Sequence, residues 1–295
     1  MKSVRFTWAT ATCASFALFV ISCQKNDHPV TSAQQSSVQT LLMNATNDVV
    51  QSASLESSDV EDILGSGDSS TCPTITFDTS KTVYPHVKKV NYGAGCTGED
   101  SLKREGEKII TYYADPDTAS AGTLISEVAF NHFSVNDINV TGSVKSYIDS
   151  SSTNHNRIIK VVTSKTLKGT NGDTKTFTGI TYWKKIEGCN TMMRKDDVFQ
   201  ITGNASGTET LDGATQIEWT STISSSNPVI KPADCNHRVK GTVNVALHIA
   251  TGGNSNFTEV LDYGNGNCDN KATLSINGGT AQDITLPLYF WPLSL

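Results

Sequence analysis

Histidine, serine and paired carboxylates are the side chains from which hydrolases build their active sites. Ser206 lies in Gly-Asn-Ala-Ser-Gly, which lacks the Gly-x-Ser-x-Gly spacing of a nucleophile elbow. The acidic pairs Asp115/Asp117 and Asp196/Asp197 lie in turn-like contexts, where charged turn tips are the ordinary interpretation. The histidines show no His-x-His pattern and no pair three or four residues apart, so the usual zinc motifs are absent. The six histidines are His28, His86, His132, His155, His237 and His248. These spacings predict a protein that is not an enzyme.

The glycine-rich segment 262–270 carries the best candidate ligands for a cation. Its oxygen-bearing side chains are Asp262, Asn265, Asn267 and Asp269. Calcium favours clusters of carboxylate and amide oxygens, but two carboxylates are few and the spacing matches no EF-hand. A Gly/Asn turn fixed by Cys268 is the alternative. We therefore expect no cofactor, with calcium as the weaker hypothesis.

Seven cysteines point to disulfide chemistry rather than to metal binding, because no Cys-x-x-Cys pair is present. The segment Asn-Tyr-Gly-Ala-Gly-Cys ending at Cys96 is echoed by Asp-Tyr-Gly-Asn-Gly-Asn-Cys ending at Cys268. Each follows an expected strand that begins near another cysteine, Cys72 or Cys235. The simplest pairing is Cys72–Cys96 and Cys235–Cys268, which leaves Cys189 free, although four bridged cysteines allow three connectivities.

The N-terminus predicts export and lipidation. A short basic head precedes an apolar stretch that is too short to span a bilayer permanently, and the stretch ends Val-Ile-Ser-Cys at Cys23. This tetrad resembles a bacterial lipobox, in which the cysteine sulfur receives a diacylglycerol and the new amine is acylated. Residues 1–22 are then the signal peptide and 23–36 a polar tether. We expect a lipoprotein, carrying palmitate or a similar acyl group, in the cell envelope and most simply at the outer membrane.

Composition favours strands. The chain has 295 residues, of which 37 are Thr and 32 are Ser, and only 18% are charged. This excludes a coiled coil and a helical bundle, because those are rich in Leu, Ala, Glu and Lys. The net charge of −6 argues against a nucleic-acid partner, since phosphate neutralisation needs clustered Lys and Arg. The membrane, reached through the N-terminal lipid, is the expected partner.

Hydrophobic periodicity divides the mature chain into two parts. Apolar residues recur at helical spacing in 37–68, which predicts an N-terminal helical segment. From residue 70 to 295 the period is two, which predicts one all-β domain. Asn-Gly or Asp-Gly pairs at 171–172, 212–213 and 277–278 predict tight hairpins, and Asn136-Asp137 a fourth.

Glycines inside the expected strands predict bends in the sheet. They follow an apolar-x-Gly pattern, and they are Gly142, Gly179, Gly203 and Gly241. Because glycine inside a strand usually marks a bulge or bend, four of them favour a strongly curved sheet. The expected fold class is therefore all-β, a curved antiparallel meander of about a dozen strands forming an open half-barrel. A two-layer sandwich is the alternative.

Several motifs together resemble a family of uncharacterised lipoproteins of Bacteroidetes. They are the lipobox, Cys-Pro-x-Ile-Thr-Phe-Asp at 72–78, Tyr-Gly-x-Gly-Cys at 92–96, Lys-Arg-x-Gly-x-Lys-Ile-Ile-Thr-Tyr at 103–112 and Asp-Tyr-Gly-x-Gly-x-Cys-Asp-Asn at 262–270. The resemblance covers most of the mature chain. It implies export, lipidation and a β-rich domain, and it implies no particular activity.

We therefore expect a lipid-anchored envelope protein that is a non-enzymatic binding or structural module. A curved sheet could hold a lipid or other apolar ligand on an apolar concave face, in a cavity of several hundred Å3. The alternatives are an envelope hydrolase and a calcium-dependent glycan-binding module.

Overall fold

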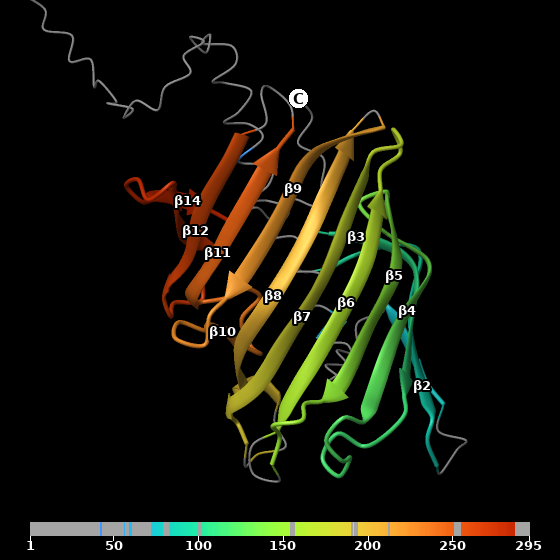
Figure 1. Ribbon diagram of the computed structural model, residues 1–295. Coiled ribbons are helices and arrows are strands. Elements are labelled where there is room, and N and C mark those ends of the chain that lie inside the picture. The colour runs from blue at the N-terminus through green and yellow to red at the C-terminus, as the bar shows by residue number, and fades with distance from the viewer. Residues whose placement is uncertain are drawn as a thin grey trace, which may run out of the picture.

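The computed structural model (Figure 1) describes most of the chain from residue 72 onward. The described ranges are 72–78, 83–98, 102–153, 157–189, 191, 194–211, 213–250 and 255–286. Four residues of the predicted helical segment are also described, and all four are helical and buried: Leu42, Glu56, Asp59 and Val60. The predicted signal peptide (1–22), the tether (23–36) and Cys23 lie outside the described residues.

Fourteen strands form one antiparallel sheet, which confirms the all-β curved meander predicted from the sequence. They are β1 (Thr74–Phe77), β2 (His86–Thr97), β3 (Lys103–Tyr112), β4 (Leu124–Val135), β5 (Ile138–Ile148), β6 (Ile158–Lys168), β7 (Thr174–Glu187), β8 (Val198–Leu211), β9 (Ala214–Ile223), β10 (Val229–Pro232), β11 (Lys240–Ile249), β12 (Ser255–Asn265), β13 (Lys271–Ile276) and β14 (Gln282–Thr285). A short 3-10 helix, Arg194–Asp196, precedes β8. The sheet is open and single, so the sandwich alternative does not apply.

Most strands pair with their neighbours in sequence, as expected of a meander. The exception lies between β8 and β11, where both β9 and β10 pair with the same two neighbouring strands. β9 pairs with both β8 and β11 over most of its length, while the short β10 pairs with Val198–Ile201 of β8 and with Lys240 of β11. Consequently β8, β9, β11 and β12 lie side by side (Figure 1).

Each predicted turn pair lies between two paired strands, but only the connections at 136–137 and 212–213 are two residues long, whereas those at 169–173 and 277–281 are five. Gly172 and Gly213 take positive φ angles of 93° and 78° between β6 and β7 and between β8 and β9. Asn277 and Gly278 both take positive φ between β13 and β14, and so do Asn136 and Asp137 between β4 and β5. Two consecutive positive φ angles are what a two-residue hairpin turn requires, which explains why Asn, Asp and Gly stand there.

Two of the predicted glycine bends are places where the backbones of adjacent strands approach too closely for any side chain. A Cβ atom on Gly142 would lie 2.1 Å from the carbonyl oxygen of Ser164, and one on Gly203 would lie 2.2 Å from that of Ile180. Both glycines also have φ angles above 110°, outside the usual range of other residues. These positions allow the long strands to bend, and Figure 1 shows a twisted, curved sheet.

Alternation along each strand gives the sheet a buried inner face and an exposed outer face. In β11, for example, Val243, Val245, Leu247 and Ile249 are buried and form part of the hydrophobic core. The helical residues Leu42 and Val60 belong to the same core, so these two residues pack against the inner face. Among the described residues, no helix has the length and apolar character needed to cross a bilayer.

Candidate functional site

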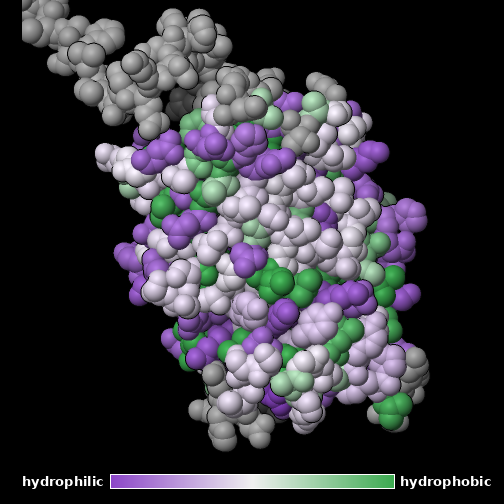
Figure 2. Space-filling model, viewed as in Figure 1, coloured by the Kyte–Doolittle hydropathy of each residue, from purple (hydrophilic) through white to green (hydrophobic). Residues whose placement is uncertain are grey.

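A shallow groove of about 770 Å3 lies on the outer face of the sheet. It crosses β7, β8, β9, β11 and β12, which follow one another from the middle of Figure 1 to its left side. In Figure 2 the middle of this face is pale, as expected where threonine, serine and glycine predominate. The groove is therefore a broad, weakly polar surface rather than a charged cleft.

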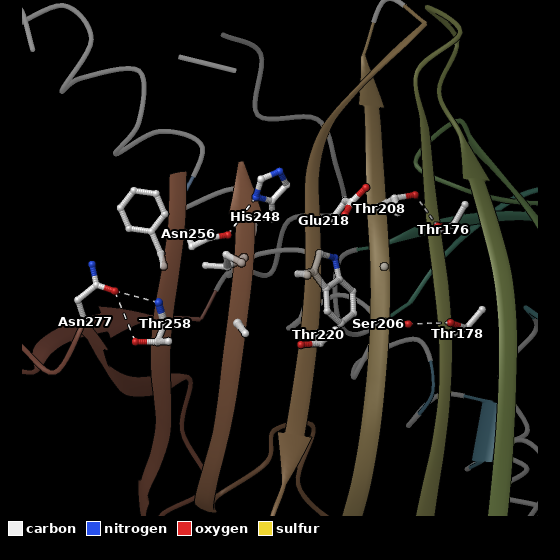
Figure 3. A pocket seen from close by; sticks show the side chains of 15 residues that line it. Thr176, Thr178, Ser206, Thr208, Glu218, Thr220, His248, Asn256, Thr258 and Asn277 are labelled. Atoms are coloured by element: carbon white, nitrogen blue, oxygen red, sulfur yellow. Dashed lines mark hydrogen bonds between the residues drawn. The ribbon is translucent and has the colours of Figure 1, made fainter. Parts of the chain in front are cut away.

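Two rows of side chains run across the strands and form the walls of the groove (Figure 3). Within each row, the strand register places every residue directly opposite the next one on the neighbouring strand. The first row is Thr176, Thr208, Glu218, His248 and Asn256, and the second row is Thr178, Ser206, Thr220, Ala246 and Thr258. Neighbouring strands lie about 4.8 Å apart, so each row extends over roughly 19 Å. A ligand lying across the strands would contact one side chain of each row on every strand that it crosses.

Hydrogen bonds between strands hold several of these side chains in place. Thr176 and Thr208 share a hydrogen bond of 2.7 Å between their hydroxyl groups. Thr178 and Ser206 share one of 2.9 Å. On the far side of the groove, Asn277 Oδ1 accepts from the backbone N–H of Thr258 at 2.9 Å (Figure 3). The two ends of the groove are thereby pre-organised.

The central strand, β9, presents free polar groups to solvent. Glu218 and Thr220 are exposed, and neither makes a side-chain hydrogen bond with another residue in the part of the chain that the structure describes. His248, opposite Glu218, has its Nδ1 atom 3.0 Å from Asn256 Oδ1. Carboxylate, hydroxyl and imidazole groups are thus available side by side for hydrogen bonding to a ligand.

The floor of the groove is made rigid by an aromatic side chain that lies beneath a glycine. A Cβ atom on Gly207 would lie 2.5 Å from the indole ring of Trp219, so the ring occupies the place of the missing side chain. Trp219 is 2% exposed and contacts the ring of Phe177, with the centroids 6.0 Å apart. Residue 207 must therefore be glycine for this tryptophan to pack on the inner face.

Three of the four residues predicted as possible calcium ligands accept hydrogen bonds from backbone N–H groups two residues further on. Asp262 Oδ1 accepts from the N–H of Gly264 at 2.8 Å, and Asn265 Oδ1 accepts from that of Asn267 at 3.3 Å. Asp269 Oδ1 accepts from the N–H of Lys271 at 3.0 Å. Within the described ranges, no three His, Cys, Asp or Glu side chains are grouped so as to hold a metal ion. This geometry supports the Gly/Asn turn alternative.

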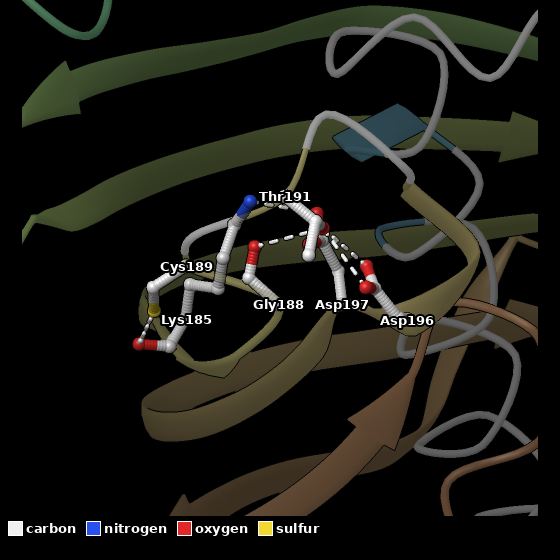
Figure 4. Close-up of polar contacts among 6 residues, drawn as sticks. All are labelled: Lys185, Gly188, Cys189, Thr191, Asp196 and Asp197. Atoms are coloured by element: carbon white, nitrogen blue, oxygen red, sulfur yellow. Dashed lines mark hydrogen bonds and ion pairs between the residues drawn. The ribbon is translucent and has the colours of Figure 1, made fainter.

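The cysteines pair as the sequence echo predicted. Cys72–Cys96 ties the chain two residues before β1 to β2, and Cys235–Cys268 ties the loop after β10 to the loop after β12. Both bridges are local, and each fixes the end of a strand pair. Cys189, in the loop after β7, is free and exposed, and its thiol lies 3.7 Å from the carbonyl oxygen of Lys185 (Figure 4).

The turn-tip interpretation of Asp196 and Asp197 is correct for the first residue and wrong for the second. Asp196 is exposed and accepts a hydrogen bond from the hydroxyl of Thr191 at 2.8 Å (Figure 4). Asp197 is 5% exposed, and its Oδ2 atom lies 2.8 Å from Lys185 Nζ. This ion pair joins the end of β7 to the start of β8, so Asp197 has a structural role.

The concave face that was expected to hold an apolar ligand is occupied by the protein's own helical residues. Glu56 Oε1 accepts from Thr181 Oγ1 at 2.7 Å and from Trp183 Nε1 at 3.2 Å. The cavity beside Glu56 measures only about 30 Å3, roughly the space of one water molecule. Tyr263 also lines it, and burial raises the pKa of its hydroxyl.

The sequence interpretation missed the groove because its residues come from five strands. The alternation of Thr with apolar residues did indicate which side chains face outward. The direct contact of β9 with β11 could not be foreseen, since β10 lies between them in the sequence. Comparison of the chain with protein-family models, with curated proteins and with solved structures finds no match.

Proposed function

We propose that this chain is a lipid-anchored protein of the cell envelope, without enzymatic activity, whose outer groove binds an extended neutral glycan. The observation that carries the proposal is the pair of polar rows across five strands of the sheet. Repeated hydroxyl and amide groups suit a polymer that presents repeated hydroxyl groups of its own. The length of the rows, roughly 19 Å, suits several sugar units in a line.

The charge of the groove favours a neutral ligand. Among the described lining residues, Glu218 is the only carboxylate and no lysine or arginine is present. A phosphate or sulfate group would find no cation there to pair with. A neutral glycan is bound by hydrogen bonds alone, which the rows supply.

The same lining argues for binding rather than hydrolysis. Glycoside hydrolases in general use two carboxyl groups that flank the scissile bond. In the described lining, Glu218 has no second carboxylate opposite it, because its cross-strand neighbours are Thr208 and His248. The groove is also shallow and open to water, which weakens the electrostatic effects on which catalysis depends.

Two features support the proposed location in the cell envelope. The lipobox ending at Cys23 supports acylation, and the two disulfides are compatible with an oxidising compartment outside the cytoplasm. Replacement of Cys23 by Ser is expected to abolish metabolic labelling with palmitate and to release the protein from the membrane fraction. Labelling that persists in the variant would contradict lipidation at this residue.

Isothermal titration with cellohexaose, xylohexaose and mannohexaose tests the groove. At least one should bind, and Thr220→Arg should weaken that binding about tenfold or more by filling the centre of the groove. The matched control is Thr141→Arg, an exposed threonine of β5 outside the groove, which should leave binding unchanged. Absence of binding to all three, or an equal loss in both variants, would contradict the proposal.

A further inference from the structure

One edge of the open sheet is formed by β1, which pairs with β2 and with no other strand that the structure describes. All four of its residues are exposed, and none of them is charged. Natural sheets usually protect a free edge with charges, bulges or a covering segment, because its unpaired backbone groups can pair with another chain. The opposite edge strand, β14, carries Asp283, whereas β1 has neither a charge nor a bulge. The edge at β1 is therefore the one suited to pairing.

The backbone groups of Ile75 and Phe77 point away from β2. Asp78 donates its N–H to the carbonyl oxygen of Val87 at 2.9 Å, and the strand register places these two residues directly opposite each other. In an antiparallel ladder, hydrogen-bonded pairs alternate with non-hydrogen-bonded pairs. Thr76 therefore bonds to β2 as Asp78 does, while the N–H and C=O groups of Ile75 and Phe77 face the free side of β1. A further strand would meet these groups.

Exposed apolar side chains concentrate at this edge. Seven large hydrophobic side chains are exposed within the described ranges, and four of them lie here: Ile75, Phe77, Val83 and Tyr84. Ring contacts hold Phe77 in place, since its ring centroid lies 5.9 Å from that of His86 and 6.1 Å from that of Tyr112. A ring that its neighbours already position loses little conformational freedom when a partner covers it. The edge thus offers an apolar contact beside its free backbone groups.

We propose that β1 pairs with β1 of a second copy of this chain, antiparallel to it, about a two-fold axis at Thr76. This register sets Ile75 opposite Phe77 of the other copy, and joins the outward backbone groups of both strands in about four hydrogen bonds. Because the two side chains lie on the same face of the strand, the pairing also covers both of them. An isologous pairing uses the same surface of each copy, so the assembly closes as a dimer.

The charges at this edge favour a second copy as the partner. Since β1 is uncharged, two copies meet there without repulsion, and a charged segment of another protein would find no opposite charge. On the outer face, Thr76 lies opposite the exposed Lys89 of β2. In the dimer the two Lys89 residues would be three strand spacings apart, about 14 Å, which exceeds the screening length of about 8 Å at physiological salt. The pairing does not depend on the groove, because β1 and β2 contribute no residue to it.

A cysteine at position 76 tests this register. In the proposed dimer Thr76 faces its own copy as a non-hydrogen-bonded pair, with Cα atoms about 4.5 Å apart, a distance that a disulfide can bridge. The full chain carrying Thr76→Cys, together with Cys189→Ser to remove the exposed natural thiol, is treated with a mild thiol oxidant and separated on a non-reducing gel. We expect a disulfide-linked dimer. The matched control, Lys89→Cys in the same background, should give about tenfold less dimer because its thiols are too far apart.

A further variant distinguishes edge pairing from random collision. Phe77→Lys, added to the Thr76→Cys chain, places a charge on the edge and should lower the yield of dimer about tenfold. The fold should persist, as circular dichroism would show, because Phe77 is 49% exposed. The proposal would be overturned by equal dimer from the position 76 and position 89 variants, by no dimer from Thr76→Cys, or by a dimer that survives Phe77→Lys. A crosslink from position 76 to a different protein, in place of the dimer, would also overturn it.

Discussion

Replacement of Asp59 by Asn removes a charge on which two buried lysines depend. The side chain keeps its size, but the ammonium groups of Lys108 and Lys165 lose the carboxylate that lies at 2.9 Å or less from them. Breaking a buried ion pair by removing one partner costs about 3–5 kcal/mol. Since a domain is stable by about 5–15 kcal/mol in total, this loss is large. The melting temperature should fall by roughly 6–20 °C.

Urea unfolding followed by circular dichroism at pH 7, with the disulfides intact, measures this loss. The matched control is Asp137→Asn, which changes a carboxylate that is 71% exposed and lies 3.8 Å from Lys103. Exposed pairs contribute little, so the control should change the free energy of unfolding by less than about 0.5 kcal/mol. If Asp59→Asn costs no more than this control, the ion pairs of Asp59 with Lys108 and Lys165 do not stabilise the fold.

Three further outcomes are expected. Burial acts to raise the pKa of the Asp59 carboxyl, but the charges of Lys108 and Lys165 hold it below its usual value. The carboxylate therefore stabilises the fold above pH ~3.9, and this stabilisation is lost as the pH falls through the folded-state pKa. Unfolding curves from pH 6 to 2 should show a shallower acid dependence in Asp59→Asn than in the parent chain, and identical slopes would contradict this. Cys235→Ser opens a bridge between residues 33 apart and should lower the free energy of unfolding by about 3–4 kcal/mol in urea titrations, whereas a loss below about 1 kcal/mol would mean that the bridge adds little. Gly142→Ala, whose Cβ atom would lie 2.1 Å from a carbonyl oxygen, should lower the melting temperature much more than Gly172→Ala, where no atom lies within 4 Å.

Local features of the fold were predictable because they depend on neighbouring residues. Gly172, Asn277 and Gly278 take positive φ angles that few other residues accept, so the hairpins and their strands followed directly. The disulfide pairing was predictable for a similar reason, since each bridge closes a local unit. The insertion of β9 between β8 and β11 depends on distant segments and carries no local signal.

The buried charges were missed although the sequence contains a signal for them. Period-two alternation places Lys165 on the same face of its strand as the buried Val161 and Leu167. A lysine on the apolar face needs an anionic partner, and Asp59 stands beside the apolar Val60 in the predicted helical segment. Which acid pairs with which lysine depends on where Asp59 lies relative to β3 and β6, and tertiary packing determines that position.

Threonine methyl resonances give the most direct test of the groove as a glycan site. A threonine-methyl-labelled chain is titrated with cellohexaose, xylohexaose and mannohexaose in turn, and the shifts of individual residues are followed. The proposal predicts saturable shifts at Thr176, Thr208, Thr220 and Thr258, which line the groove, and none at Thr141 on β5. Titrations in which no groove threonine moves with any of the three, or in which Thr141 moves equally, would contradict it.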